Sequence, residues 1–279
     1  MMVPAVRLAT KFDADDLAWV LIAASPSDPN YDYRSPQRND YPEDFAAHCR
    51  LKCREYLDAN QVVVYESPLL ADPEKKRIVA FSVWERFRHH ARHGSVNGSS
   101  DVEGTSSPYR RATGRAPSLT VPAGPPSSPR TSPSLPARRD AHPPRMSAFR
   151  DACATAKTQF FDSRFARGHM FLKILMCHPD YRRRGCGRAL TSWGVRYARR
   201  RGLTTTLFSS PMGYPLYRKL GFQEVDCFRV QVAGEDAFLD IPALVLPPLP
   251  RAVAPRRRAV VPAQVAATLD VLRPTIEVH

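Results

Sequence analysis

The chain has 279 residues, 43% of them hydrophobic, and a formal net charge of +14. This length permits one large domain or two small ones. Most of the charge lies in two stretches: residues 86–150 carry +8 and residues 251–279 carry +3, which leaves +3 for the rest. Because the composition of both stretches is typical of unstructured segments, the basicity is weak evidence for nucleic-acid binding, and we do not expect a nucleic-acid partner.

The cysteines and the apolar runs limit the cellular compartments in which we expect the protein. The six cysteines show neither a Cys-x-x-Cys pair nor the spacing of a zinc site, so we expect reduced thiols and no metal. The N-terminus turns acidic before a signal-like apolar core forms, and no apolar run is long enough to span a bilayer. These features predict a soluble cytoplasmic or nuclear protein that does not bind membranes.

The first part of the chain alternates strand and helix patterns. Residues 3–10 are predicted to form a strand. Asp13 can cap a helix that follows it, and Pro42 suits the first turn of a second helix. Two short runs at residues 61–66 and 77–85, joined by a polar turn, predict a β-hairpin.

Residues 88–145 interrupt this pattern. Eight prolines lie between positions 117 and 143, among many Ser and Arg residues. Such a segment does not bury enough apolar surface to offset the entropy lost on ordering. We therefore predict one domain over residues 1–249 with a disordered insertion, which is either a regulatory loop or a gene-model artefact. Residues 250–279 are predicted to be a loose basic tail.

After the insertion the pattern becomes regular again. Apolar residues at helical spacing predict a third helix over residues 149–161. A strand is expected over residues 171–177, because Pro179 cannot continue a sheet ladder. The next helix is expected to end before Gly202, and a short strand follows at residues 203–209.

The segment between that strand and that helix has the features of an anion site. Gly185 and Gly187 lack a Cβ atom, so the backbone can turn tightly and approach a ligand. The first amides of a helix have no internal partner, and the helix dipole adds positive charge there. Four arginines add formal charge, and the combination suits a pyrophosphate: Arg182, Arg183, Arg184 and Arg188. A Walker-type loop would need Gly-Lys-Ser/Thr, and a dinucleotide fingerprint would need a third glycine; both are missing.

At these residues the sequence resembles the GNAT superfamily, the acetyl-CoA-dependent N-acetyltransferases. Arg182-x-x-Gly185-x-Gly187 fits the family signature Gln/Arg-x-x-Gly-x-Gly/Ala. The Leu-Tyr-Arg-Lys-Leu-Gly-Phe run at residues 216–222 is similar to the family's Leu-Tyr-x-x-Leu-Gly-Phe ending. The resemblance implies an α/β (α+β) GNAT fold: a mixed central sheet flanked by helices and splayed between its fourth and fifth strands to hold acetyl-CoA. It also places a helix near residue 211 and a strand near residue 222, and residues 237–246 could supply a last strand.

The resemblance also implies roles for individual residues. Main-chain groups of the fourth strand would pair with the pantetheine arm, and the glycine loop would take the pyrophosphate. The implied cofactor-binding residues are Leu175, Met176, Cys177, Arg182, Arg183, Arg184, Gly185, Cys186, Gly187, Arg188 and Ser210. Tyr217 would protonate the leaving thiolate, since an ordinary phenol has a pKa of about 10.

The sequence does not identify the general base or the acceptor. The acid that many relatives carry on the fourth or fifth strand is missing, so Glu85, His169 or a water chain are the candidates. The acceptor is expected to be a primary amine of a small molecule or a protein. Residues 25–45 combine acids with aromatic rings, which suits a cationic amine. These are Asp28, Asp32, Asp40, Glu43 and Asp44 with Tyr31, Tyr33 and Tyr41.

The expected activity is thus that of an acyltransferase, which moves an acetyl group from acetyl-CoA to an amine by direct attack. An alternative is a catalytically silent acyl-CoA-binding or interaction module, which the missing acid would favour. A weaker alternative is a nucleic-acid-associated factor that uses the arginine-rich insertion.

Overall fold

The computed structural model describes residues 5–87, 138–165 and 167–248. They contain one seven-stranded sheet, built from β1 (Ala5–Leu8), β2 (Gln61–Pro68), β3 (Lys76–Phe87), β4 (His169–Cys177), β5 (Thr204–Phe208), β6 (Gln223–Gln231) and β7 (Phe238–Leu246). Across the sheet the strand order is β1-β2-β3-β4-β5-β7-β6. Neighbouring strands are antiparallel except β4 and β5, which are parallel. The expected mixed sheet flanked by helices is confirmed.

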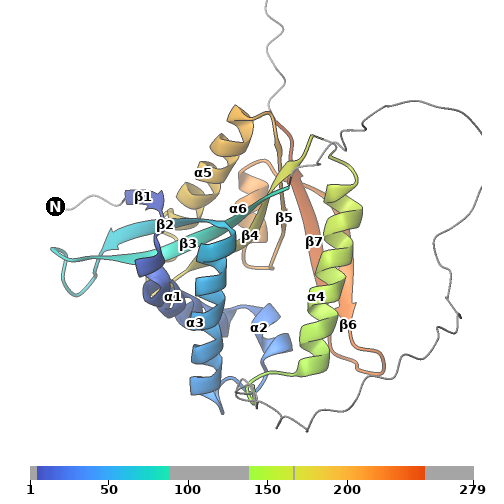
Figure 1. The fold of residues 1–279 in the computed structure, drawn as a ribbon, viewed down its shortest axis with the longest axis horizontal. Coiled ribbons are helices and arrows are strands. Elements are labelled where there is room, and N and C mark those ends of the chain that lie inside the picture. The colour runs from blue at the N-terminus through green and yellow to red at the C-terminus, as the bar shows by residue number, and fades with distance from the viewer. Residues whose placement is uncertain (1–4, 88–137, 166, 249–279) are drawn as a thin grey trace, which may run out of the picture. The chain divides into compact units, whose positions relative to one another are not determined.

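Helices cover both faces of this sheet (Figure 1). They are α1 (Ala14–Ala24), α2 (Pro29–Arg34), α3 (Pro42–Ala59), α4 (Pro143–Lys157), α5 (Cys186–Arg200) and α6 (Tyr214–Lys219). One apolar cluster joins α1 and α3 to β2 and β3, and another joins α5 and α6 to the same strands and to β4. The adjacent residues Ala80 and Phe81 of β3 belong to different clusters, so these clusters lie on opposite faces. A further cluster joins α4 to β6 and β7.

Helix α5 illustrates how the local sequence sets an element. Leu190, Val195 and Ala198 recur at helical spacing and are buried against the sheet. Gly202 follows the last turn with a φ of +64°, which glycine adopts without strain. The end of the helix before Gly202 was predicted. Asp13 behaves differently, because its carboxylate accepts from the Thr10 amide at 2.6 Å and pairs with Arg7 rather than capping α1.

The chain departs from the predicted boundaries at two places. Residues 29–34, between the first two predicted helices, form the unpredicted helix α2, which Asp28 caps by accepting a hydrogen bond from the Asn30 amide at 3.0 Å. Residues 138–145, expected inside the disordered insertion, are part of the folded domain: α4 begins at Pro143, and Asp140 is fully buried. The rest of that insertion and the predicted tail lie outside the described residues.

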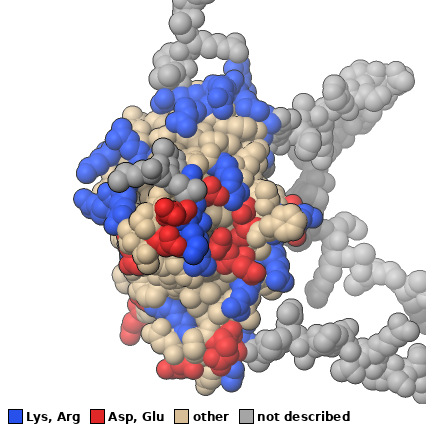
Figure 2. Space-filling view, turned by 90° about the vertical axis from the view of Figure 1, so that its left-hand side faces the viewer, with Lys and Arg blue, Asp and Glu red and all other residues tan. Residues whose placement is uncertain are grey.

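The surface of the described part carries both signs of charge. In Figure 2, Lys and Arg gather toward the upper end of the face shown, while Asp and Glu lie mainly across its middle and lower parts. Within the described ranges, no helix combines the length and apolar character needed to cross a membrane.

Candidate active site

The sheet opens between β4 and β5. The two strands pair only from His169 to Leu172. The next residue, Lys173, has no partner in β3, because Leu172 lies opposite Trp84 and Ile174 opposite Val83. Such a bulge bends a strand and interrupts its ladder. Beyond the bulge, within the described chain, the main-chain groups of β4 that face β5 have no strand partner.

The three residues expected to hold the pantetheine arm lie on this unpaired half of β4. The side chains of Leu175 and Cys177 pack against the cluster beneath α5, and Met176 packs against the cluster beneath α1 and α3. Their side chains are therefore occupied on the two faces. The main-chain groups that face away from β3 remain for a ligand, apart from the Cys177 carbonyl, which accepts from Arg182. An extended chain that carries amides can pair with such an edge as an added strand would.

The glycine loop follows directly. Gly185 is the N-cap of α5 with a φ of +88°, and Arg183 also has a positive φ, of 63°. A Cβ atom on Gly187 would lie 3.1 Å from Leu216 Cδ2 and 3.6 Å from Leu175 Cδ2. The missing side chain thus lets the first turn of α5 lie close to both β4 and α6. The outward amides of this turn form an anion site of the expected kind.

The four arginines of this region divide into two groups. Arg183, Arg184 and Arg188 are exposed around the loop. The guanidinium of Arg182 instead donates to Ser27 Oγ at 3.0 Å, to the Ala24 carbonyl at 3.4 Å and to the Cys177 carbonyl at 3.4 Å. Arg182 therefore joins the end of α1 to the end of β4, and its side chain is engaged within the protein.

Two thiols lie at the base of the loop. Cys186 is buried and Cys177 is half-buried, and all six cysteines of the chain are free. The Cys186 thiol donates to the Tyr181 carbonyl at 3.5 Å, and the Cys177 thiol donates to the His178 carbonyl at 3.6 Å. Both side chains belong to the cluster beneath α5, so β4 and α5 meet closely at the loop.

Tyr217 lies on α6 and faces the cluster beneath α5. It is 5% exposed, and its ring packs edge-on against Phe222 with centroids 5.8 Å apart. Burial raises the pKa of Tyr217 well above its usual value, and the charge of Asp28 raises it further. No residue of the described chain forms a hydrogen bond with its hydroxyl. Ser210 Oγ accepts from the Gly213 amide at 3.2 Å, so Ser210 stabilises the turn that precedes α6.

The two candidate bases lie elsewhere. His169 is fully buried, with Nδ1 2.7 Å from Thr206 Oγ1 and Nε2 2.8 Å from Asp162 Oδ1. Glu85 pairs with Lys157 Nζ at 3.2 Å. His169 belongs to the aromatic cluster on the α4 side of the sheet, whereas Tyr217 packs on the α5 side. The fold thus places Tyr217 apart from both candidate bases, and burial lowers the pKa of His169.

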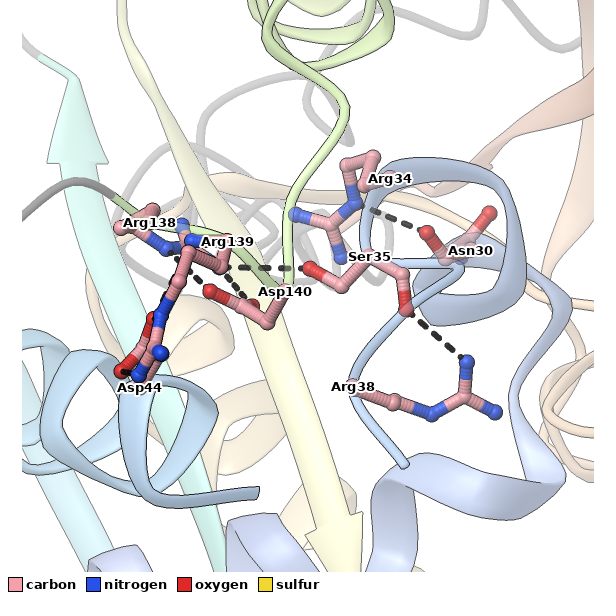
Figure 3. A network of polar contacts seen from close by, with 8 residues as sticks. All are labelled: Asn30, Arg34, Ser35, Arg38, Asp44, Arg138, Arg139 and Asp140. Carbon is pink, nitrogen blue, oxygen red and sulfur yellow. Dashed lines mark hydrogen bonds and ion pairs between the residues drawn. The ribbon is translucent and has the colours of Figure 1, made fainter. Parts of the chain in front are cut away.

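The acids expected to bind a cationic amine are mostly neutralised by arginines. Asp32 pairs with Arg38, and Asp44 pairs with Arg139 at 2.8 Å. Figure 3 shows Arg139 reaching Asp44 from the segment before α4. Asp28 differs, because it is 7% exposed and forms no ion pair among the described residues. Nothing in the sequence distinguished it from the other acids except its position before Pro29-Asn30, typical of a helix cap.

Comparison with known proteins gives a family model, a curated relative and solved structures. Residues 151–224 match the family model described as "Acetyltransferase (GNAT) domain". An acetyltransferase from Stachybotrys chartarum is 28% identical over 92 residues, which cover 31% of this chain. The match spans only 40% of that fungal protein.

Two solved structures illustrate the structural similarity. A polyamine N-acetyltransferase from Drosophila melanogaster superposes with a TM-score of 0.53 at 14% identity, over 88% of this chain and 100% of that one. A putative acetyltransferase from Salmonella typhimurium, solved with its cofactor acetyl-CoA, gives a TM-score of 0.42 at 14% identity, over 92% of this chain and 99% of that one. At this identity, the first superposition shows a shared fold.

Proposed function

The chain carries a GNAT acetyltransferase domain, and on that basis we propose that it transfers the acetyl group of acetyl-CoA to a primary amine. One observation carries the proposal: β4 leaves β5 at the Lys173 bulge and runs, unpaired on that side, to the glycine loop at the start of α5. This arrangement offers a row of main-chain groups and then an anion site, in the order in which a pantetheine arm and a pyrophosphate would need them.

The residues at this site fit acetyl-CoA. The unpaired half of β4 supplies main-chain donors and acceptors at Leu175, Met176 and Cys177. The turn from Gly185 to Gly187 supplies outward amides. Exposed Arg183, Arg184 and Arg188 supply the charge that a pyrophosphate requires. When bound, acetyl-CoA would supply an activated acetyl group.

Tyr217 is the group that we assign to the leaving sulfur. Its buried phenol remains protonated at neutral pH, and its hydroxyl has no hydrogen-bond partner among the described residues. A donor held in place by packing can stabilise a developing thiolate without reorganisation. The relatives named above include an enzyme of polyamines, which supports a small amine as the acceptor class to test first.

The proposal is tested by calorimetry with acetyl-CoA and by free-CoA release with a panel of primary amines. Gly187→Glu should abolish acetyl-CoA binding, because a side chain there meets Leu216 and brings a carboxylate to the anion site. Gln159→Glu, an exposed residue on the α4 side, adds the same charge and should leave binding unchanged. Equal affinity of the Gly187 variant and the wild type would remove the loop from the site.

A further inference from the structure

Asp28 lies in the connection between α1 and α2, close to the proposed site. Its carboxylate accepts one hydrogen bond, from the Asn30 amide at 3.0 Å, and is 7% exposed. The charges of Arg34 and Arg182 lower the pKa of Asp28 and the charge of Asp32 raises it, but burial has the largest effect, and the net pKa is raised. The result is a buried carboxylate without a salt bridge among the described residues.

A hydrogen bond places the Asp28 segment beside the cofactor loop, and an electrostatic interaction links its carboxylate to Tyr217 of α6. Arg182, which precedes the glycine loop, donates to Ser27 Oγ at 3.0 Å, one residue before Asp28. The charge of Asp28 also raises the pKa of the buried Tyr217, so the two side chains lie within electrostatic reach.

We propose that Asp28 accepts the proton of the acceptor ammonium and so delivers the neutral amine to the thioester. This inference rests on the proposed acetyl transfer and names the base for it. The other acids of the same region are less suited. Asp32 pairs with Arg38, Glu43 and Asp44 share Arg139, and Asp40 is exposed. Asp28 is buried and forms no ion pair among the described residues.

The step balances as follows. The ammonium gives one proton to the Asp28 carboxylate, and the neutral nitrogen attacks the thioester carbonyl. The new C–N bond forms, the C–S bond breaks, and Tyr217 gives its phenolic proton to the leaving thiolate. The second proton lost by nitrogen restores the phenol, and Asp28 releases its proton to solvent. The net products are the amide, free CoA and one proton.

The environment of Asp28 suits this role. A base works best when its pKa lies near the working pH, and burial raises the pKa of Asp28 above its usual value. A cation bound at Asp28 would also offset the charge that raises the pKa of Tyr217, which makes the phenol a better donor when the amine is present. The same residue would thus link acceptor binding to proton donation.

A purely structural role is the competing explanation, since Asp28 caps α2. Asn caps a helix about as well as Asp, so Asp28→Asn keeps the cap and removes the base. Asp58→Asn, an exposed position on α3, makes the same charge change away from the site and serves as the control. All variants are full-length chains, checked by thermal unfolding.

The experiment measures kcat/KM for a primary alkylamine from pH 6 to pH 10 at saturating acetyl-CoA, and repeats it with a weakly basic amine. We expect Asp28→Asn to lose about 10²-fold or more at pH 7, the usual scale for a positioned base. The loss should shrink toward pH 10 and with the weakly basic amine, because the acceptor is then already neutral. Acetyl-CoA affinity in calorimetry and the Asp58→Asn kinetics should match the wild type.

Two results would overturn the assignment. Unchanged kcat/KM in Asp28→Asn would remove the proton-accepting role, and a loss that is equal at every pH and with both amines would make Asp28 structural. If the wild type itself releases no CoA with any amine, both the proposed function and the role of Asp28 are rejected. If the wild type and Asp28→Asn are equally active, only the role of Asp28 is rejected.

Discussion

At the scale of single residues, the candidate chemistry rests on side chains whose surroundings differ from those of their neighbours. Tyr217 is the phenol on α6 that is buried beside the anion loop, and Asp28 is a buried acid of the α1–α2 region without an ion pair in the described part of the chain. His169 has the right intrinsic pKa for a base but faces the other side of the sheet, where Asp162 and Thr206 occupy both ring nitrogens. Residue type alone therefore does not assign a role here.

The donor role of Tyr217 leads to a kinetic prediction. Tyr217→Phe keeps the ring packed on Phe222, so the fold should survive. If the phenol protonates the thiolate, kcat should fall about 10²-fold or more. The KM for acetyl-CoA should change little, because the loop and β4 contacts remain.

Tyr197→Phe is the matched control, since Tyr197 lies on α5 and stacks on Trp193 with ring centroids 5.5 Å apart. Steady-state kinetics with a confirmed amine provides the measurement. Wild-type turnover in Tyr217→Phe would leave the tyrosine as a packing residue, and positioning would have to account for the rate.

At the scale of elements, the site depends on how closely α5 packs on the sheet. Gly194 lies at the crossing of α5 over β3, where an added Cβ would fall 2.1 Å from Trp84 Cζ2. The Trp84 indole is fixed there, because Nε1 donates to Ser82 Oγ at 2.9 Å. The helix whose N-terminus forms the anion site is thus positioned by a glycine two turns further on.

The close approach of Gly194 to Trp84 predicts that Gly194→Ala destabilises the protein, which is the opposite of the usual effect of this substitution in a helix. Gly→Ala inside a helix normally stabilises by about 1 kcal/mol through propensity. At Gly194 the clash with Trp84 should outweigh that gain, since overpacking costs roughly 1–3 kcal/mol. We therefore expect Gly194→Ala to lower the free energy of unfolding and to weaken acetyl-CoA binding.

Urea denaturation and calorimetry would measure the two effects. Arg196→Ala, an exposed position on the same helix, should change neither by much. A Gly194→Ala protein more stable than the wild type would mean that α5 lies farther from β3 than described.

At the scale of the whole molecule, the segment before α4 connects distant parts of the chain. Asp140 is fully buried, and Arg138 Nη2 lies 2.5 Å from its carboxylate. The Gln37 amide donates to the Asp140 carbonyl at 3.2 Å, and the His142 amide donates to the Arg34 carbonyl at 2.9 Å. Figure 3 shows this segment beside the end of α2 and the start of α3. Residues 138–142 therefore belong to the domain although the sequence before them is Pro-rich.

Two deletions separate this segment from the preceding one. Replacing residues 88–137 by a Gly/Ser linker of about 15 residues, which spans roughly 50 Å when extended, should leave cooperative unfolding and acetyl-CoA binding intact. The reason is the composition of the deleted segment, which is poor in large apolar residues. Replacing residues 88–145 should lower the melting temperature, because the Asp140 contacts and the first turn of α4 are lost as well.

Thermal unfolding of both deletion proteins and of the full chain is the measurement. Loss of cooperative unfolding in the shorter deletion would show that residues 88–137 contribute to the core. Equal melting temperatures of the two deletion proteins would show that the Asp140 contacts are dispensable.

The sequence by itself determined the local features and the resemblance to a family. The strand that ends before Pro179, the Gly185-x-Gly187 turn and the helix closed by Gly202 are all present, because each depends on spacing or on a backbone conformation that one residue type favours. The resemblance to the GNAT superfamily is likewise confirmed, since its motifs are contiguous in the chain.

Only the tertiary structure decided which side chains meet. The bulge at Lys173 shifts the alternation of β4, so that Leu172 and Leu175, three residues apart, pack on the same face. The partner of Asp44 is Arg139, 95 positions away and beyond the Pro-rich segment. Pairings of this kind arise when distant elements pack together, and local patterns contain no information about them. For the same reason, Asp28 could be distinguished from the neighbouring acids only once the structure showed which of those acids pair with arginines.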